Sequence, residues 1–326
     1  MPLRLIEVFA AHGHGDLMAA IAERFSALIF RAEPAQAGDL EVFRIVARPE
    51  KQQELIDQIQ GVLGKEKSWR INIMAIEATI PEVERPESER PSPEQATREE
   101  LYAEIERGAR IDGVFLLLVV LSTIVAAIGL LENNVTIVIA AMLIAPLLNP
   151  NVAMALGSTL GDRELVSRAA STNAAGIAIS VLCAAAVGFV SPTQSASAEL
   201  LSRTTLGYDN VVLALASGAA GALSLTTRLP GALVGVMVAV ALLPPAVALG
   251  YMIGAAQFEL AAGPAALLAV NVVCVNLSAQ LVFLSRGVKP RTWLERRAAK
   301  ESTGISLAVA SGLLAVLVAV IYWRQR

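Results

Sequence analysis

The stretch Ile139–Gly161, IAAMLIAPLLNPNVAMALGSTLG, decides the fold, because a membrane-like apolar run is interrupted halfway along it. The interruption consists of Pro146, Asn149, Pro150 and Asn151. Proline removes a backbone donor and clashes with the preceding turn, so the sequence predicts a broken helix here. In hydrocarbon the freed backbone groups need partners, which places such a break inside protein or beside a water-filled cavity.

A second proline segment, VAVALLPPAVALG, surrounds Pro244 and Pro245, and Pro244 lies 98 residues after Pro146. Proline-interrupted segments in corresponding positions indicate a solute or ion site near the middle of a transporter-like membrane fold. The sequence therefore predicts a second broken helix at this point.

An internal repeat accompanies the two proline segments. The same shift of 98 residues superimposes further residues, namely Ala141 on Ala239, Asn173 on Asn271 and Ser180 on Ser278. Spans one to three would then correspond to spans four to six. Because each unit crosses the membrane an odd number of times, the second unit is inverted relative to the first. We expect a 3+3 inverted repeat with a broken helix in each half. The alternative is a polytopic bundle in which the prolines only kink the helices.

The composition is that of a membrane protein with a soluble part. Hydrophobic residues make up 55% of the chain and charged residues 17%, with a mean hydropathy of +0.59. These values lie outside the range of soluble globular proteins. Most acidic residues precede Asp112, which predicts a soluble head followed by a body embedded in a lipid bilayer. The net charge of −3, without a basic tract that contains aromatic residues, argues against nucleic acid as a partner.

The chain divides into four regions. Residues 1–80 alternate short strands and amphipathic helices in the order β-α-β-β-α-β, which predicts an α+β ferredoxin-like head. Residues 81–96 form a Pro/Glu-rich linker. Residues 97–110 predict an amphipathic helix that lies on the membrane surface, docks the head, or extends the first membrane helix. Residues 111–326 form the transmembrane domain.

The transmembrane domain is expected to be polytopic and α-helical, with seven helices of about 20 apolar residues each. The expected spans are 112–131, 134–158 (broken), 168–190, 210–226, 230–253 (broken), 262–284 and 304–323. Most basic residues fall in loops on one side, so the positive-inside rule places the head and these loops in the cytosol. The first residues lack a secretory signal. We expect the inner (plasma) membrane of a bacterium or archaeon.

The candidate solute-binding residues belong to the membrane body. They are Pro146, Asn149, Asn151, Asn173, Pro244, Pro245 and Asn271. No ionisable side chain lies well inside an expected span, which argues against a carboxylate proton relay. Helices that begin at a break direct free N–H groups into the cavity, so the site could hold an anion or a polar neutral solute. Asparagine also joins helices, the interpretation we favour for Asn276.

In the head, His12, His14 and Asp16 follow the first expected strand and are candidate ligands for zinc, copper or nickel. Asp16 is equally suited to cap a helix. A regulatory pocket for a small molecule on the head is a further alternative, and no cofactor is expected.

Glycines at a spacing of four residues recur in the membrane body, at 157 and 161, 231 and 235, and 250 and 254. This spacing allows close helix packing, either within one chain or at the interface of a homo-oligomer. The sequence contains no nucleophile elbow, P-loop or dinucleotide fingerprint, so an enzyme is not expected.

The run AAMLIAPLLNP, with ALGSTLGD and the later VALLPP segment, resembles the prokaryotic membrane proteins grouped as the domain of unknown function 389 family. The resemblance covers about residues 110–290, and Ala141–Pro146 with Gly161-Asp162 is its most specific part. It implies a membrane architecture with a proline-broken core and a cytosolic head. It implies no reaction, substrate or ligand residue.

The function expected from these observations is a transporter or channel for a small polar or anionic solute, with its site at the two breaks. One alternative is a membrane sensor whose head binds a ligand or metal. The other is a scaffold that assembles partners without transport.

Overall fold

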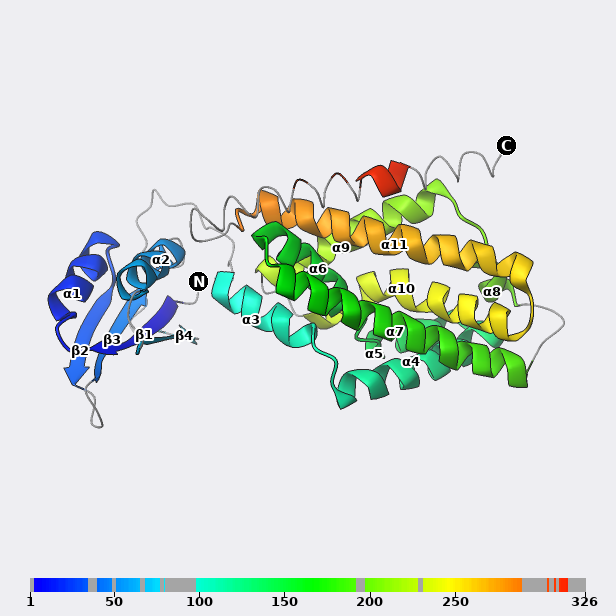
Figure 1. Ribbon diagram of the computed structural model, residues 1–326, viewed down its shortest axis with the longest axis horizontal. Helices are drawn as coiled ribbons and strands as arrows, with labels where there is room; N and C mark the ends of the chain where they lie inside the picture. Colours follow the sequence, from blue (N-terminus) through cyan, green and yellow to red (C-terminus); the bar gives the residue numbers. More distant parts are fainter. Residues whose placement is uncertain are drawn as a thin grey trace. The chain divides into compact units, whose positions relative to one another are not determined.

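The computed structural model describes part of the chain, in two compact units with bounds Met1–Glu100 and Leu101–Arg326 (Figure 1). The described residues are 3–34, 40–48, 51–64, 68–76, 79, 98–191, 197–227, 231–288, 304, 308 and 311–315, with the side chains of 34, 98, 99 and 231–241 left aside. The expected linker, residues 81–96, lies outside the described residues.

The head is a four-stranded antiparallel sheet with two helices, in the predicted order β-α-β-β-α-β. Its elements are β1 (Leu3–Ala11), α1 (Gly15–Arg24), β2 (Ile29–Pro34), β3 (Leu40–Ala47), α2 (Gln52–Leu63) and β4 (Arg70–Ile76). The strands lie in the order β2-β3-β1-β4, and Ile6 of β1 is paired with Ile45 of β3 and Ile73 of β4. This is the arrangement of the split β-α-β motif.

Alternation along β1 explains why the two helices cover one face of the sheet. Ile6, Val8 and Ala10 are fully buried, and they share an apolar core with residues of both α1 and α2 (Figure 1). Side chains of a strand alternate between its faces, so these three point to the helices together.

The second unit is a helical body. Its elements are α3 (Arg98–Gly108), α4 (Gly113–Leu131), α5 (Val135–Ile144), α6 (Leu148–Leu160), α7 (Arg163–Val190), α8 (Ala198–Ser202), α9 (Tyr208–Thr227), α10 (Gly231–Gly254) and α11 (Phe258–Ser285). By length and composition, α4, α7, α9 and α11 could each cross a membrane, and the bent pair α5–α6 could form a fifth span. Most of the expected seventh span, 304–323, lies outside the described residues.

Helices α4 and α7 pack side by side and run in the same direction. The Thr123 hydroxyl donates to the Ser180 hydroxyl at 3.1 Å, and Phe115 lies against Gly176. Residue numbers therefore rise together along both helices. Each helix begins at an aspartate: Asp112 accepts from the N–H of the third helical residue of α4, and Asp162 does the same for α7.

Glycines bring α7 and α10 into close contact, again in parallel. A Cβ atom at Gly250 would overlap the backbone carbonyl of Val181, and one at Gly254 would overlap that of Ala185. This pair of glycines thus packs one helix against another within the chain, which is one of the two alternatives that the glycine spacing predicted. The surroundings of the pair at 231 and 235 lie outside the described residues.

Helices α9 and α11 are also parallel to each other, and they run opposite to α10. Gly218 of α9 lies against Val275 of α11, while Gly263 near the start of α11 lies against Thr204, just before α9. Because α11 follows α10 after a short turn and packs against it, the direction reverses between them.

The expected break at Pro244-Pro245 is wrong, because α10 is helical from Gly231 to Gly254 with both prolines inside it. Both prolines are buried. The helix packs against α4, α5, α6, α7, α9 and α11. A helix enclosed by neighbours tolerates proline when nearby groups can satisfy the freed carbonyls.

Candidate functional site

The break between α5 and α6 is the feature around which the candidate site is built. The two helices are bent by 52° relative to each other. Ala145 has an extended backbone (φ −69°, ψ 122°), the conformation that a following proline favours, so Pro146 ends α5 at this point. The predicted broken helix is therefore confirmed at the first proline segment.

Helix α6 begins without a side-chain cap. Leu147 occupies the N-cap position, and no hydrogen bond from its side chain closes the helix end in the described structure. Pro150 lies in the first turn, where a missing N–H is tolerated. The first turn therefore presents free backbone N–H groups and the positive end of the helix dipole at the break.

Asn151 is the polar residue most clearly left unsatisfied. Its side chain is fully buried, and neither its Oδ1 nor its Nδ2 atom has a hydrogen-bond partner among the described residues. A buried polar group without a partner destabilises a fold by about 1–3 kcal/mol. Such a group calls for an explanation, and a bound solute or water at the break would supply the missing partner.

Asn173 of α7 lies near the same level as Asn151. The two helices form an antiparallel pair in which Gly157 of α6 contacts Val166 of α7, and Gly161 closes the turn with a positive φ of 73°. Asn151 precedes Gly157 by six residues, and residue 172 follows Val166 by six residues. In an antiparallel pair these two positions lie at about the same height, which places Asn173 near the level of Asn151. Asn173 is 4% exposed and its Oδ1 atom has no partner among the described residues.

A pair of polar residues on α11 contacts the start of α6. Asn276 Nδ2 donates to the carbonyl oxygen of Asn151 at 3.4 Å, and Gln280 Nε2 donates to Asn276 Oδ1. Asn276 thus joins two helices, in line with the interpretation favoured for it from sequence. Gln280 is fully buried and was missed, although its position four residues after Asn276 places both on one helix face.

The second proline segment does not form a matching half-site. Leu243 and Ala246, next to the prolines, belong to an apolar cluster that also contains Ala145 and Leu147 from the α5–α6 break. The two segments therefore contribute to one apolar core, but α10 presents no helix end at its prolines. Asn271 of α11 is buried, 5% exposed, and lies five residues before Asn276.

Helix α3 is clamped to the turn between α6 and α7. Tyr102 Oη donates to Asp162 Oδ2 at 2.7 Å, and burial together with this bond raises the pKa of Tyr102. Arg168 Nη1 donates to Glu106 Oε1 at 3.1 Å. Hydrogen bonding from Arg110, and the charge of Arg168, hold the pKa of Glu106 below its usual range. Because α3 ends at Gly108, before α4, it is not an extension of the first membrane helix.

The C-terminal end of α3 reaches the break itself. Thr172 Oγ1 donates to the carbonyl oxygen of Ala109 at 2.7 Å. A Cβ atom at Gly108 would lie 2.7 Å from Cβ of Asn149, so only glycine allows this approach. Asn149 is exposed. The α3 helix thus lies directly beside the first turn of α6.

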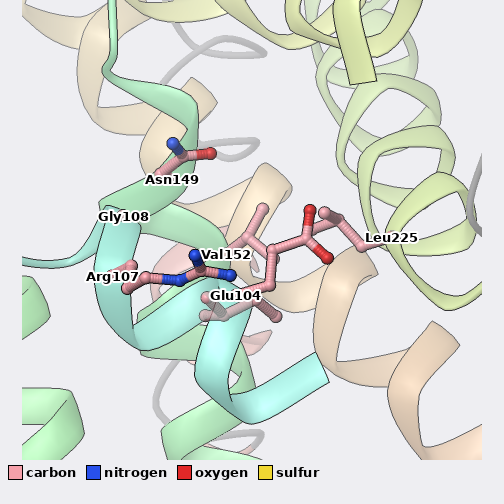
Figure 2. A pocket seen from close by; sticks show the side chains of 7 residues that line it. Glu104, Arg107, Gly108, Asn149, Val152 and Leu225 are labelled. Carbon is pink, nitrogen blue, oxygen red and sulfur yellow. The ribbon is translucent and has the colours of Figure 1, made fainter. Parts of the chain in front are cut away.

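A half-open cavity of about 360 Å³ lies between α3, α6 and α9 (Figure 2). Its lining consists of Glu104, Ile105, Arg107 and Gly108 from α3, Asn149 and Val152 from α6, and Leu225 from α9. Of the sequence-predicted site residues, Asn149 alone lines it. The α3 residues were missed because nothing in their local pattern indicates that the helix folds back onto a break 40 residues later.

Replacing Tyr102 by phenylalanine is expected to lower the melting temperature, because the hydrogen bond to Asp162 contributes about 1 kcal/mol. The raised pKa means that this contribution is complete below pH about 10, the usual tyrosine pKa, and is lost as pH rises through the folded-state pKa. The difference in melting temperature between the wild type and Tyr102→Phe should therefore shrink at alkaline pH. A difference that stayed constant to the most alkaline pH measurable would contradict this account.

The head residues predicted as metal ligands, His12, His14 and Asp16, lie just before and at the start of α1. His12 Nδ1 lies 3.0 Å from Glu41 Oε1, and α1 has His14 as its N-cap residue, with Asp16 in the first turn rather than at the cap. Within the part of the chain that the structure describes, no group of three or more His, Cys, Asp or Glu side chains is arranged to hold a metal ion.

Comparisons with known proteins agree with the sequence resemblance. The family model for the domain of unknown function DUF389 matches residues 142–277, which contain the start of α6, Asn173 and Asn276. An uncharacterised protein of Methanocaldococcus jannaschii is 31% identical over 286 residues, covering 87% of this chain and 89% of the relative. No solved structure matches the chain. With a relative this similar over nearly its whole length, and a family model matched across the α5–α6 break, the chain belongs to the DUF389 family.

Proposed function

We propose that this protein is a membrane transporter or channel for a small polar or anionic solute, and that the solute passes the α5–α6 break. The observation that carries the proposal is the side chain of Asn151, buried in an apolar helical body without a partner among the described residues. An asparagine that only joined helices would be hydrogen-bonded, as Asn276 is.

The first turn of α6 and the amide of Asn173 supply further polar groups at the same level. N–H groups of an uncapped helix start favour an anion or the oxygen of a neutral solute. The amide groups can accept as well as donate hydrogen bonds. The site therefore suits a small solute with several polar atoms and does not require a charged side chain within the membrane.

A 3+3 inverted repeat is part of the proposal. Helix α9 begins 95 residues after α4, α10 begins 96 after α5, and α11 begins 95 after α7. The two sets of three also run in opposite directions, as an inverted pair would. These boundaries favour an offset near 95, so Asn173 and Asn271 occupy positions about one helical turn apart in their helices. A seventh span over 304–323 would lie outside the repeat.

The proposed orientation follows from the basic residues. Arg107, Arg110, Arg163 and Arg168 lie at the end of the body that carries α3, and Arg286 follows α11 at the same end. The positive-inside rule favours a cytosolic location for this end and for the head, in the inner membrane of a bacterium or archaeon. The break would then communicate with the cytosol near α3.

One observation favours a sensor as the second candidate. The chain that leaves the head continues into α3, and α3 is bonded to the α6–α7 turn through Tyr102 and Glu106. A ligand-induced change in the head could therefore reach the break through α3. Transport and sensing are compatible if the head regulates the flux.

Flux into proteoliposomes of the purified full chain tests the proposal. The panel should include small anions, small cations and neutral polar solutes, with protein-free vesicles as the baseline. We expect saturable or channel-like flux of at least one anion or neutral polar solute, reduced in Asn173→Ala. Flux of no solute in the panel would overturn the transport proposal and shift attention to the head as a sensor.

A further inference from the structure

The cavity beside the break contains two opposite charges on one wall. Glu104 and Arg107 are exposed residues three apart on α3, and both line the cavity together with Asn149 (Figure 2). Residues three apart lie on the same face of a helix. Val152 and Leu225 contribute apolar side chains to the same lining.

Within the part of the chain that the structure describes, neither charge is paired with an opposite charge. The Nε atom of Arg107 donates to the Ala103 carbonyl at 3.1 Å, which leaves its two Nη groups free within the described residues. Glu104 makes no hydrogen bond or ion pair with any described residue. The contrast with Glu106 is informative, because that residue, on the same helix, pairs with both Arg110 and Arg168.

The charge balance restricts the ligands that fit. A ligand with only a negative charge would be attracted by Arg107 and repelled by Glu104, and one with only a positive charge would experience the reverse, so the two effects largely offset each other for either ligand. A zwitterion can place its carboxylate near Arg107 and the donors of Asn149, and its ammonium group near Glu104. Arginine binds carboxylates through paired N–H groups, which favours this orientation.

We propose that the cavity binds a small zwitterionic solute, of the amino-acid class, as the entrance site of the pathway through the break. This inference rests on the proposed transport function and names its solute class. The volume of about 360 Å³ accommodates a solute of this size with accompanying water. Because Asn149 lines the cavity and Asn151 lies two residues further along α6, the bound solute would be next to the break.

Equilibrium binding to the full chain in detergent micelles tests the proposal without requiring flux. The probes are the zwitterions glycine and 4-aminobutyrate, with butyrate and butylammonium as analogues that carry a single charge. We expect at least one zwitterion to bind about fivefold more tightly than either analogue. A zwitterion is attracted at both ends and avoids the repulsion that a single charge meets, and in a partly exposed site such a gain in affinity is modest.

Charge-removing variants then provide reciprocal outcomes. Glu104→Gln should shift the preference toward butyrate, and Arg107→Gln should shift it toward butylammonium. The matched control is Arg163→Gln, an exposed arginine at the same end of the body that does not line the cavity, and it should leave all four affinities unchanged. Two variants that shift preference in opposite directions cannot both be explained by misfolding.

The outcomes separate this inference from the transport proposal. Zwitterion binding without flux would support the binding site in the cavity and contradict transport, and with it the role of the cavity as an entrance. Flux of another solute, with no zwitterion binding, would overturn the inference and leave transport standing. Equal affinities for all four probes, or preferences that do not change in either variant, would also overturn the inference.

Discussion

Asn151→Leu is expected to raise the melting temperature of the protein in detergent without added solute. Leucine has the same branching as asparagine but no polar atoms, so the substitution removes a buried amide that has no partner among the described residues. Relief of that penalty is worth about 1–3 kcal/mol, partly offset by the greater volume of leucine. At about 2–4 °C per kcal/mol, the gain should amount to several degrees.

The matched control is Asn276→Leu, the same chemical change on a neighbouring helix. Asn276 donates to the Asn151 carbonyl and accepts from Gln280, so its loss breaks two hydrogen bonds and should lower the melting temperature. Opposite signs for the two variants are the expected result. A loss of stability in Asn151→Leu as large as that in Asn276→Leu would show that Asn151 is a structural contact.

Gly254→Ala is expected to prevent the protein from folding. The added Cβ atom would overlap the carbonyl oxygen of Ala185 and lie 2.7 Å from its carbonyl carbon. Both atoms are backbone atoms in the last two turns of α7, which packs against α10 along this stretch. Overpacking of this kind costs about 3 kcal/mol or more. Loss of monodisperse protein in size-exclusion chromatography would report the failure.

The control is Gly113→Ala, where nothing lies within 4 Å of the new Cβ atom and alanine favours the helix. That variant should behave as the wild type. If Gly254→Ala instead remained folded and changed only the oligomeric state, the glycine would belong to an interface between copies of the chain. Such a result would contradict the packing of α7 against α10.

Periodicity and chain-breaking residues were enough to predict the head and one of the two breaks. Alternation in β1 and helical spacing in α1 and α2 indicated the head, since each element buries one face against a single core. The break after Ile144 was predictable because Pro146 acts locally, through the backbone of Ala145.

The second proline segment shows the limit of that local rule. Pro244 and Pro245 have the same chemistry as Pro146, yet α10 stays helical because it is enclosed by six other helices. Whether a helix ends at a proline or continues through it depends on the neighbours that satisfy the freed carbonyls. Those neighbours come from distant parts of the chain and leave no trace in the local sequence.

The asparagines of the candidate site could be identified from the sequence, but the α3 residues around them could not. Asn149, Asn151 and Asn173 stand out as polar residues in apolar runs. Glu104, Arg107 and Gly108 lie on an ordinary charged helix, and their role depends on the clamp that Tyr102 makes with Asp162. Tertiary contacts of this kind assemble the cavity, so only the structure places α3 beside the break.

Solute flux through Asn151→Leu protein, reconstituted at the same density as wild type, tests most directly whether the break is the pathway. The account predicts that flux of the best wild-type solute is lost, or falls by at least about tenfold, in a variant that is more stable than wild type. A stability gain rules out misfolding as the cause of the loss. Undiminished flux through Asn151→Leu would contradict the account, because the solute would then cross the membrane body elsewhere.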